Sequence, residues 1–294
     1  MKRLCLALLF MLFACDNEQE NSVTAETTEL LDAIVSSAVA FSHSDLGAQS
    51  FFETPTLAYV SGHFYFEDDL APDIIFGLDI ELLEGLEDPV RFEGADWMAL
   101  AGFDRTGRLW FPVGYPENRE GIPTNTDNWM VQDFEVDLQP NTWYKMTIQC
   151  DFDMLEFVSI RLEGGGVDKT LSITGNPLEY PNYAPFDKAS LTAYTFALRG
   201  VEFAPENEAG FEVYFDDIEM GIQSGTGQFT VIFEDGFENQ VTVGDIPITN
   251  IPIALDSITE ALWYLENEDA KLLVTDAMAR TGQHSLKCIA DLRK

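Results

Sequence analysis

Hydrophobic side chains recur at every second residue through most of the chain, which is the period of a β-strand. The stretches 74–82, 130–138, 144–150 and 158–162 each alternate apolar residues with small, polar or acidic ones. One side of each stretch is therefore expected to face a core, formed by Ile74, Phe76, Leu78, Ile80, Leu82, Met130, Phe134, Val136, Leu138, Tyr144, Met146, Ile148, Cys150, Val158, Ile160 and Leu162. A single apolar face per strand is typical of antiparallel sheets.

Short turn sequences separate these strands. They occur at 104–107, 139–141, 164–166 and 174–177, and they are rich in the Gly, Pro, Asn and Asp residues that turns favour. Many strands at short intervals, without a long helix, predict a β-sandwich. Residues 26–41 are the exception, because their apolar positions also fit helical spacing, and the sequence leaves helix and strand open there.

The stretch FEVYFDDIEMG, residues 211–221, interrupts its own alternation. Its apolar residues hold one phase up to residue 215 and the other phase from residue 218. The shift falls at Asp216 and Asp217, and it predicts a β-bulge at that point.

This aromatic-Asp-Asp-apolar strand resembles the closing strand of concanavalin-like and carbohydrate-binding-module-like jelly rolls. The sequence Asn-Thr-Trp-Tyr-Lys at 141–145 is similar to the start of a central strand in the same folds. The resemblance extends over about residues 45–222, and it implies an all-β, antiparallel β-sandwich of the jelly-roll type. It also implies a structural Ca²⁺ held by Asp216 or Asp217 together with Asp45. The alternative is that the Asp pair only forms the bulge.

A segment rich in Gly, Ser and Thr at 223–227 follows, and the chain then restarts with FTVIFEDGFE. The later Gly-x-x-Ser-Leu sequence at 282–286 resembles a strand near the beginning of modules of this class. We therefore expect a jelly-roll domain over 30–222, a linker, and a partial second β-sandwich module over 228–294. Two alternatives stay open for this second part. It belongs to a longer protein of several modules, or residues 228–234 pair with strands of the first domain and complete its sheet.

The first residues, MKRLCLALLFMLFAC, combine a basic start with a short apolar run. The run is too short to span a bilayer and predicts a signal peptide over 1–14. Its ending, Leu-Phe-Ala-Cys, resembles the lipobox of bacterial lipoproteins, which implies acylation of Cys15, including palmitate, and anchoring through several acyl chains. Residues 15–29 would then form an acidic tether at a bacterial membrane, such as the outer membrane, facing the periplasm or the cell surface. An ordinary secretory signal is the alternative.

The charge of the chain restricts its partners. There are 51 acidic and 16 basic residues, which gives a net charge of −35. Such a surface repels the phosphates of nucleic acids and of anionic lipids. We therefore exclude nucleic acid as a partner, and we expect membrane contact through the lipid anchor only.

Two cysteines remain once the signal peptide is removed and Cys15 is acylated. Cys150 and Cys288 both lie in the apolar phase of alternating segments. We expect two separate buried thiols, with a disulfide between them as the alternative in an oxidising compartment.

Alternating acids are candidate catalytic groups, because glycoside hydrolases use two carboxylates. The stretch 135–139 resembles the Glu-x-Asp-x-Glu strand of laminarinase-type jelly-roll hydrolases, but Gln139 stands at its last position and cannot transfer the catalytic proton. The pair Asp79 and Glu81 is also incomplete, since Gly77 occupies the place of a leading Glu. We interpret both stretches as acidic positions on the outer faces of sheets and expect no catalytic residue there.

The tryptophans are better candidates for a ligand site. Trp110 and Trp129 occupy the phase opposite to the core residues, and they are expected to point away from the main core. An outward ring can stack on a sugar, and carboxylates nearby can accept hydrogen bonds from its hydroxyls. The predicted carbohydrate site consists of Trp110, Trp129, Asp133, Glu135, Trp97 and Tyr115. The alternative is that a loop packs over these rings.

The sequence thus predicts a lipid-anchored envelope protein whose jelly-roll domain binds a polysaccharide or oligosaccharide without catalysis. One alternative is a polysaccharide-degrading enzyme of laminarinase or lyase type, which requires a complete acid/base set in one cleft. Another is a structural or adhesion module with envelope proteins as partners and no small ligand, in which the outward tryptophans would be covered or scattered.

Overall fold

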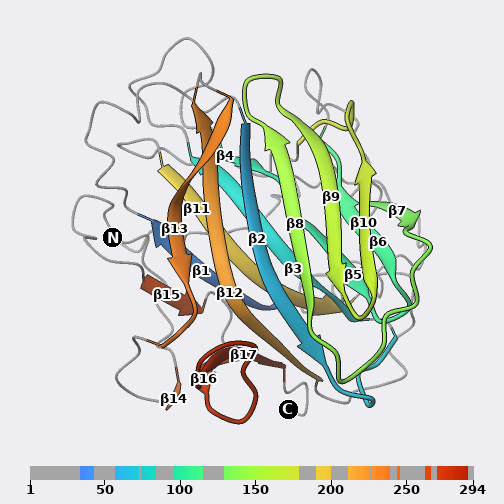
Figure 1. Ribbon diagram of the computed structural model, residues 1–294, viewed down its shortest axis with the longest axis vertical. Coiled ribbons are helices and arrows are strands. Elements are labelled where there is room, and N and C mark those ends of the chain that lie inside the picture. The colour runs from blue at the N-terminus through green and yellow to red at the C-terminus, as the bar shows by residue number, and fades with distance from the viewer. Residues whose placement is uncertain are drawn as a thin grey trace, which may run out of the picture.

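The computed structural model describes residues 34–42, 57–72, 74–83, 96–114, 129–178, 190–199, 211–224, 227–238, 244–245, 262–265 and 270–290. In these ranges the strands form two antiparallel sheets that lie one in front of the other (Figure 1). The same ranges contain no helix that is long and apolar enough to cross a membrane. The predicted all-β antiparallel sandwich is confirmed.

We refer to the first sheet as sheet A. Its strands follow the order β15 (Leu262–Leu265), β1 (Ile34–Ser42), β11 (Ser190–Arg199), β3 (Ile74–Leu83), β5 (Ala101–Asp104), β6 (Arg108–Pro112) and β7 (Trp129–Asp133), and β4 (Asp96–Met98) also pairs with β3. β1 settles the open assignment of the stretch 26–41 from residue 34 onward. It pairs with β11 on one side and β15 on the other, and these backbone hydrogen bonds outweigh the helical spacing of its apolar residues.

We refer to the second sheet as sheet B. Its strands follow the order β10 (Val167–Ser172), β9 (Glu156–Gly164), β8 (Tyr144–Asp151), β2 (Leu57–Phe66), β12 (Phe211–Ser224), β17 (Ser285–Ala290), β16 (Ala270–Thr275) and β14 (Gly244–Asp245). β13 (Gln228–Asp235) also pairs with β12. β2 and β12 form the middle of the sheet, and most of the contacts described below lie on or beside them.

The last part of the chain belongs to the same two sheets. β13 pairs with residues 218–224 of β12, β17 pairs with residues 211–215 of the same strand, and β15 pairs with β1. Of the two alternatives for this segment, the pairing agrees with the one in which it completes the sheets of the first domain. The separate second module expected over 228–294 is therefore corrected, because its strands cover edges of sheets A and B that would otherwise lie open.

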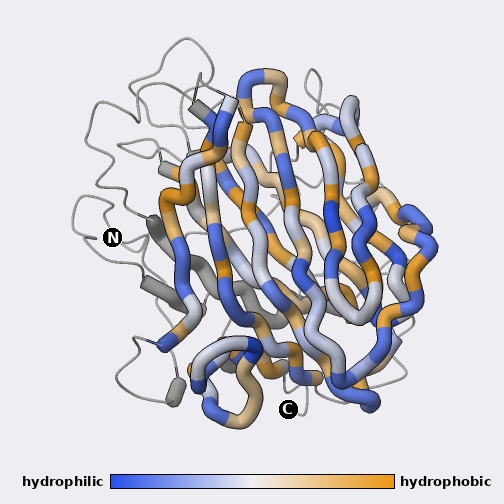
Figure 2. The backbone as a smooth tube through the Cα atoms, viewed as in Figure 1, coloured by the Kyte–Doolittle hydropathy of each residue, from blue (hydrophilic) through white to orange (hydrophobic). Residues whose placement is uncertain are grey.

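The core lies between the two sheets. The predicted inward side chains of 74–82 and 144–150 are all buried, and Figure 2 shows hydrophobic and hydrophilic residues alternating along the strands of sheet B. Cys150 and Cys288 are both buried and free, so the prediction of two separate thiols is confirmed. Burial also raises the pKa of the Cys150 thiol well above its ordinary value, which keeps it protonated and unreactive.

The predicted bulge in β12 is confirmed. The register between β12 and β2 shifts between Asp216 and Glu219, and Asp217 has a positive φ of 49°. This bulge interrupts the backbone pairing of β12 with β2 in the middle of sheet B, and it changes the direction in which the two Asp side chains point.

The strand predicted over 130–138 is shorter in the structure. β7 ends at Asp133, and Glu135 has a φ of 52°, in the left-handed region that a strand does not use. Phe134 and Leu138 are nevertheless buried. The alternation in the sequence thus reflects an irregular segment that inserts apolar side chains into the core without pairing as a strand.

Candidate functional site

The outer face of sheet B, turned away from sheet A, carries a row of aromatic and polar side chains. Along β2 this face holds Tyr59, Ser61, His63 and Tyr65, while the residues between them point inward. Figure 1 looks onto this face. Neighbouring strands add side chains in register, and Lys145 of β8 lies opposite His63.

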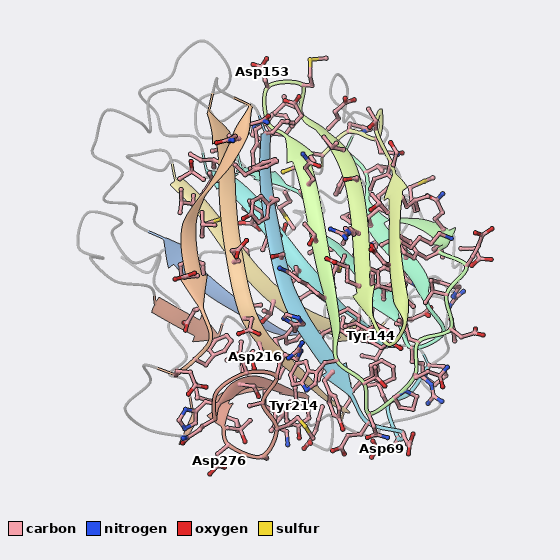
Figure 3. The ribbon with its side chains drawn as sticks, viewed as in Figure 1. Asp69, Tyr144, Asp153, Tyr214, Asp216 and Asp276 are labelled. Carbon is pink, nitrogen blue, oxygen red and sulfur yellow. The ribbon has the colours of Figure 1, made fainter. Side chains whose placement is uncertain are left out.

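An aromatic cluster lies at one end of the row. The ring centroid of Tyr65 is 5.3 Å from that of Trp143 and 5.8 Å from that of Tyr214, which Figure 3 labels on β12. The Tyr65 hydroxyl donates to Asn141 Oδ1 at 2.9 Å, and Lys287 Nζ lies 5.0 Å from the centre of the Tyr214 ring. Tyr65 and Tyr214 are buried, whereas Trp143 is half-buried.

A second aromatic pair lies at the other end. Tyr59 of β2 meets Phe229 of β13 edge to face, with ring centroids 5.1 Å apart. The Tyr59 hydroxyl donates to Glu219, and burial together with this carboxylate raises the pKa of Tyr59 far above its ordinary value. Phe229 is 39% exposed.

Polar groups fill the middle of the row. His63 Nδ1 lies 3.4 Å from Asp217 Oδ2. Burial lowers the pKa of His63 to about 4 against the opposing effect of Asp217, and the cations of Arg280 and Lys145 lower it further. His63 is therefore neutral at pH 7. Ser61 is 1% exposed, and its Oγ has no hydrogen-bond partner in the part of the chain that the structure describes.

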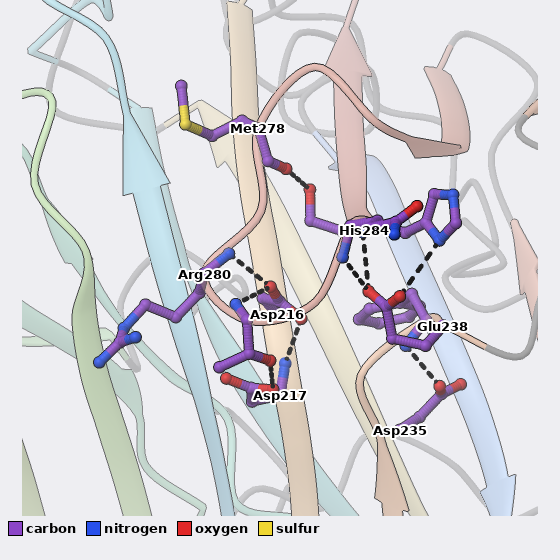
Figure 4. A network of polar contacts seen from close by, with 11 residues as sticks. Asp216, Asp217, Asp235, Glu238, Met278, Arg280 and His284 are labelled. Atoms are coloured by element: carbon purple, nitrogen blue, oxygen red, sulfur yellow. Dashed lines mark hydrogen bonds and ion pairs between the residues drawn. The ribbon is translucent and has the colours of Figure 1, made fainter.

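The loop 276–284, which joins β16 to β17 and which we refer to as the latch loop, is bound to β12 beside this row (Figure 4). The buried Asp216 carboxylate accepts hydrogen bonds from the backbone N–H groups of Asp217 at 2.8 Å, Arg280 at 2.7 Å and Thr281 at 3.2 Å. Thr281 Oγ1 donates to Asp217 Oδ1 at 2.6 Å. The bulge in β12 thus fixes the part of the latch loop that carries Arg280.

A second carboxylate holds the far end of the latch loop. Glu238 Oε1 accepts hydrogen bonds from the backbone N–H groups of Gln283 at 2.8 Å and His284 at 2.7 Å (Figure 4). These donors lower the pKa of Glu238. Burial instead raises the pKa of Asp216 to about 6, although its three N–H donors act in the opposite direction. The stabilising contribution of Asp216 therefore decreases as the pH rises through about 6.

The low pKa of His63 predicts a pH-dependent contribution to stability. In the unfolded chain His63 binds a proton near its ordinary pKa of 6.5, whereas in the folded chain it does so only near 4. Its contribution is complete above 6.5 and is lost as the pH falls toward 4. We expect the difference in unfolding free energy between the wild type and His63→Gln to shrink as the pH falls from about 7 to about 5. Urea denaturation at both pH values measures this difference. The titration of Asp216 affects both proteins equally and therefore cancels from the difference. An unchanged difference would show that the environment of His63 does not perturb its titration.

Trp110 and Trp129 lie together on the outer face of sheet A, so their predicted orientation away from the main core is confirmed. They pack with Ile75 and Phe196 in a separate apolar cluster. Trp110 is 2% exposed, and its Nε1 donates to Asp104 Oδ2 at 2.9 Å. The prediction that Trp110 stacks on a sugar is therefore corrected, since its ring has no free face. Trp129 is half-buried against the same cluster.

The other residues of the predicted carbohydrate site do not assemble with the tryptophans. Asp133 Oδ1 accepts a hydrogen bond from the backbone N–H of Glu135 at 2.7 Å, and Glu135 forms an ion pair with Lys169 at 2.7 Å. Both acids thus stabilise the chain after β7. Trp97 is 5% exposed within the main core, so the prediction that it binds sugar is corrected. Tyr115 lies outside the described residues.

The predicted Ca²⁺ ligands have other partners. The carboxylate oxygens of Asp216 and Asp217 accept hydrogen bonds from backbone and hydroxyl donors of the latch loop, and such donors occupy the lone pairs that a cation needs. The described residues contain no group of three or more His, Cys, Asp or Glu side chains placed to hold a metal. Asp45 lies outside them. These contacts fit the alternative, in which the Asp pair serves the bulge.

The acid pair on β3 is less exposed than an acidic surface position would be. Asp79 and Glu81 alternate with the core residues of β3, as an outer-face position requires, but they are only 2% and 8% exposed and are therefore covered rather than solvated. A Cβ atom at Gly77 would come within 2.1 Å of the backbone oxygen of Ala101. Close packing of β3 against β5 therefore explains why glycine precedes this pair.

The accessible rings of the sheet B row, Trp143 and Phe229, are missing from the predicted site. Trp143 directly precedes Tyr144, which belongs to the inward phase, so the alternation already placed Trp143 on the outer face. Phe229 gave no such signal, because its exposure depends on β13 pairing with β12 rather than beginning a second core.

No protein-family model matches the chain, and no curated protein does so either. Among solved structures, an alginate lyase from Pseudomonas aeruginosa matches with 9% identity and a TM-score of 0.30, over 57% of this chain and 66% of that one. A marine alginate lyase of family PL-14 from Aplysia kurodai matches with 10% identity and a TM-score of 0.27, over 49% and 69%. The alginate lyase A1-II′, of polysaccharide lyase family 7, matches with 14% identity and a TM-score of 0.25, over 50% and 63%. These values are too low to add to what the two sheets show.

Proposed function

We propose that this chain binds a glycan chain along β2 on the outer face of sheet B. The observation that carries the proposal is the placement of two accessible rings, Trp143 and Phe229, at opposite ends of a row of polar side chains. Aromatic rings offer flat apolar surfaces to the faces of sugar rings, and polar groups between them bind the hydroxyls.

The length of the row favours an oligosaccharide over a single sugar. Tyr59 and Tyr65, which carry the two aromatic ends, are six residues apart on β2, or about 20 Å at the rise of an extended strand. Between them, His63 of β2 and Thr147 and Gln149 of β8 present partly exposed donors and acceptors. A row of this length accommodates several consecutive sugar rings.

Affinity electrophoresis of the full chain in mild detergent tests this proposal. Gels that contain one soluble polysaccharide each, from a panel of neutral and acidic polymers, are expected to retard the protein for at least one polymer. Retardation by none of them would contradict glycan binding. Release of shortened products from the polymer would replace the binding function with the alternative, a polysaccharide-degrading enzyme.

We further propose that Cys15 carries the lipid that attaches the protein to a bacterial membrane, as the lipobox-like sequence before it suggests. Several acyl chains bind a bilayer stably, whereas one chain binds only reversibly. Expression in a bacterial host with labelled palmitate is expected to label the wild type and leave Cys15→Ser unlabelled and outside the membrane fraction. Equal labelling of both proteins would contradict this assignment.

A further inference from the structure

Two cations on the sheet B row have no carboxylate partner. Lys145 lies opposite His63 in the β2–β8 pairing, and the guanidinium of Arg280 extends from the latch loop toward β2 (Figure 4). Neither side chain forms an ion pair or donates a hydrogen bond within the part of the chain that the structure describes. Both cations lower the pKa of His63.

The other basic side chains that the structure describes each have an ion-pair or hydrogen-bond partner. Arg108, Arg161, Lys169 and Lys287 each form an ion pair with a carboxylate. Arg105 donates to the backbone oxygens of Asp68 and Leu70. In a chain with 51 acidic and 16 basic residues, carboxylates are abundant enough to pair every base. Lys145 and Arg280, which have no such partner among the described residues, are therefore exceptions on the candidate glycan face.

The carboxylates beside these cations already have partners. Glu163, which lies opposite Lys145 on β9, forms an ion pair with Arg161. Asp217 accepts a hydrogen bond from Thr281 and lies beside His63, and Glu219 accepts one from the Tyr59 hydroxyl. His63 is neutral and competes for no anion, while the buried Ser61 hydroxyl on the same face of β2 has no hydrogen-bond partner among the described residues. The middle of the row thus offers two charged donors and one buried hydroxyl.

We propose that Lys145, Arg280 and Ser61 form a subsite for an anionic substituent, a carboxylate or a sulfate, on the glycan. This inference rests on the proposed function, and it assigns the class of glycan. An oxyanion accepts hydrogen bonds from an ammonium and a guanidinium at once, and such charge-assisted bonds are stronger than those between neutral groups. The negative charge of the whole protein repels anions at long range, so these local cations are needed to hold one.

Isothermal titration calorimetry on the full chain in mild detergent tests the subsite. The ligands are an oligogalacturonate, its fully methyl-esterified form and a sulfated galactan oligosaccharide of similar length. We expect the ester to bind about tenfold more weakly than the best anionic ligand, the effect of losing one charge-assisted hydrogen bond. Tight binding of the uronate alone or of the sulfated oligosaccharide alone identifies the natural substituent.

Matched variants separate the subsite from general electrostatics. Lys145→Met and Arg280→Met are each expected to weaken binding of the anionic ligand about tenfold while binding of the ester stays unchanged, which also shows that each variant is folded. Lys169→Met, which removes a paired cation on β10, is expected to change neither. Equal affinity for the ester and the anionic ligands, with no effect of the two variants, would overturn the subsite and leave glycan binding intact. No binding of any ligand would overturn both.

Discussion

Trp143→Ala is expected to weaken binding of the glycan by at least about tenfold, which corresponds to about 1.4 kcal/mol. Trp143 is the largest accessible ring of the row, and it rests on Tyr65 at a centroid distance of 5.3 Å. Its orientation is therefore fixed before the ligand arrives, and little conformational entropy is lost on binding. Retardation in affinity gels and calorimetry with the same polymer measure the loss.

The controls for this prediction separate binding from folding. Trp129→Ala removes a half-buried ring from the outer face of sheet A, and it is expected to leave glycan binding unchanged. Phe229→Ala removes the accessible ring at the other end of the row, and its effect should be smaller, because a single edge-to-face contact supports that ring. Met154→Ala, at a 66% exposed position in the β8–β9 turn, should have no effect. If Trp143→Ala binds like the wild type, the glycan does not lie along β2.

Asp216→Ala is expected to lower the unfolding free energy by about 2–4 kcal/mol at pH 7, because backbone N–H groups lose their acceptor. The buried carboxylate bonds three of them, from the bulge itself and from the latch loop. Alanine at this position leaves the bulge without the group that closes it. Urea denaturation measures the loss as a shift of the midpoint.

Hydrogen exchange identifies where the Asp216 variant is altered. The amides of Arg280 and Thr281 should exchange much faster in Asp216→Ala, since both donate to this carboxylate. Asp276→Ala provides the control, because it removes an exposed carboxylate from the same loop and should stay within about 0.5 kcal/mol of the wild type. Unchanged exchange at Arg280 and Thr281 would show that Asp216 does not hold the latch loop.

Much of the fold could be predicted because alternation is a local property. Tyr144, Met146, Ile148 and Cys150 are buried and the residues between them are half-buried, as their period of two indicates. The bulge at Asp216 could also be predicted, because a shift in the alternation of apolar residues corresponds to a shift in the register between β12 and β2. Pairing partners were not, because residues far apart in the chain decide them. For that reason β13 appeared to begin a new module when it in fact extends sheet B.

The predicted ligand site shows the limit of reading one strand at a time. The alternation correctly predicted that Trp110 points away from the main core. Only the structure showed that Phe196, Ile75 and Asp104 enclose its ring. The same reasoning applied to Trp143 gives the same outward phase, and there the side chain is half-buried and not enclosed as Trp110 is. Exposure of an outward side chain depends on what packs over the sheet, which no alternation pattern contains.

The sequence by itself determined the class of fold, the inward sides of 74–82 and 144–150 and the bulge, because each follows from the period of side chains along a short stretch. The tertiary structure decided that the last strands complete the first two sheets and that Asp216 holds the latch loop. It also decided that Lys145 lies opposite His63 and that neither Lys145 nor Arg280 forms an ion pair among the described residues. These features depend on β2, β8, β12 and a distant loop coming together, and such contacts form only when the chain closes over long sequence separations.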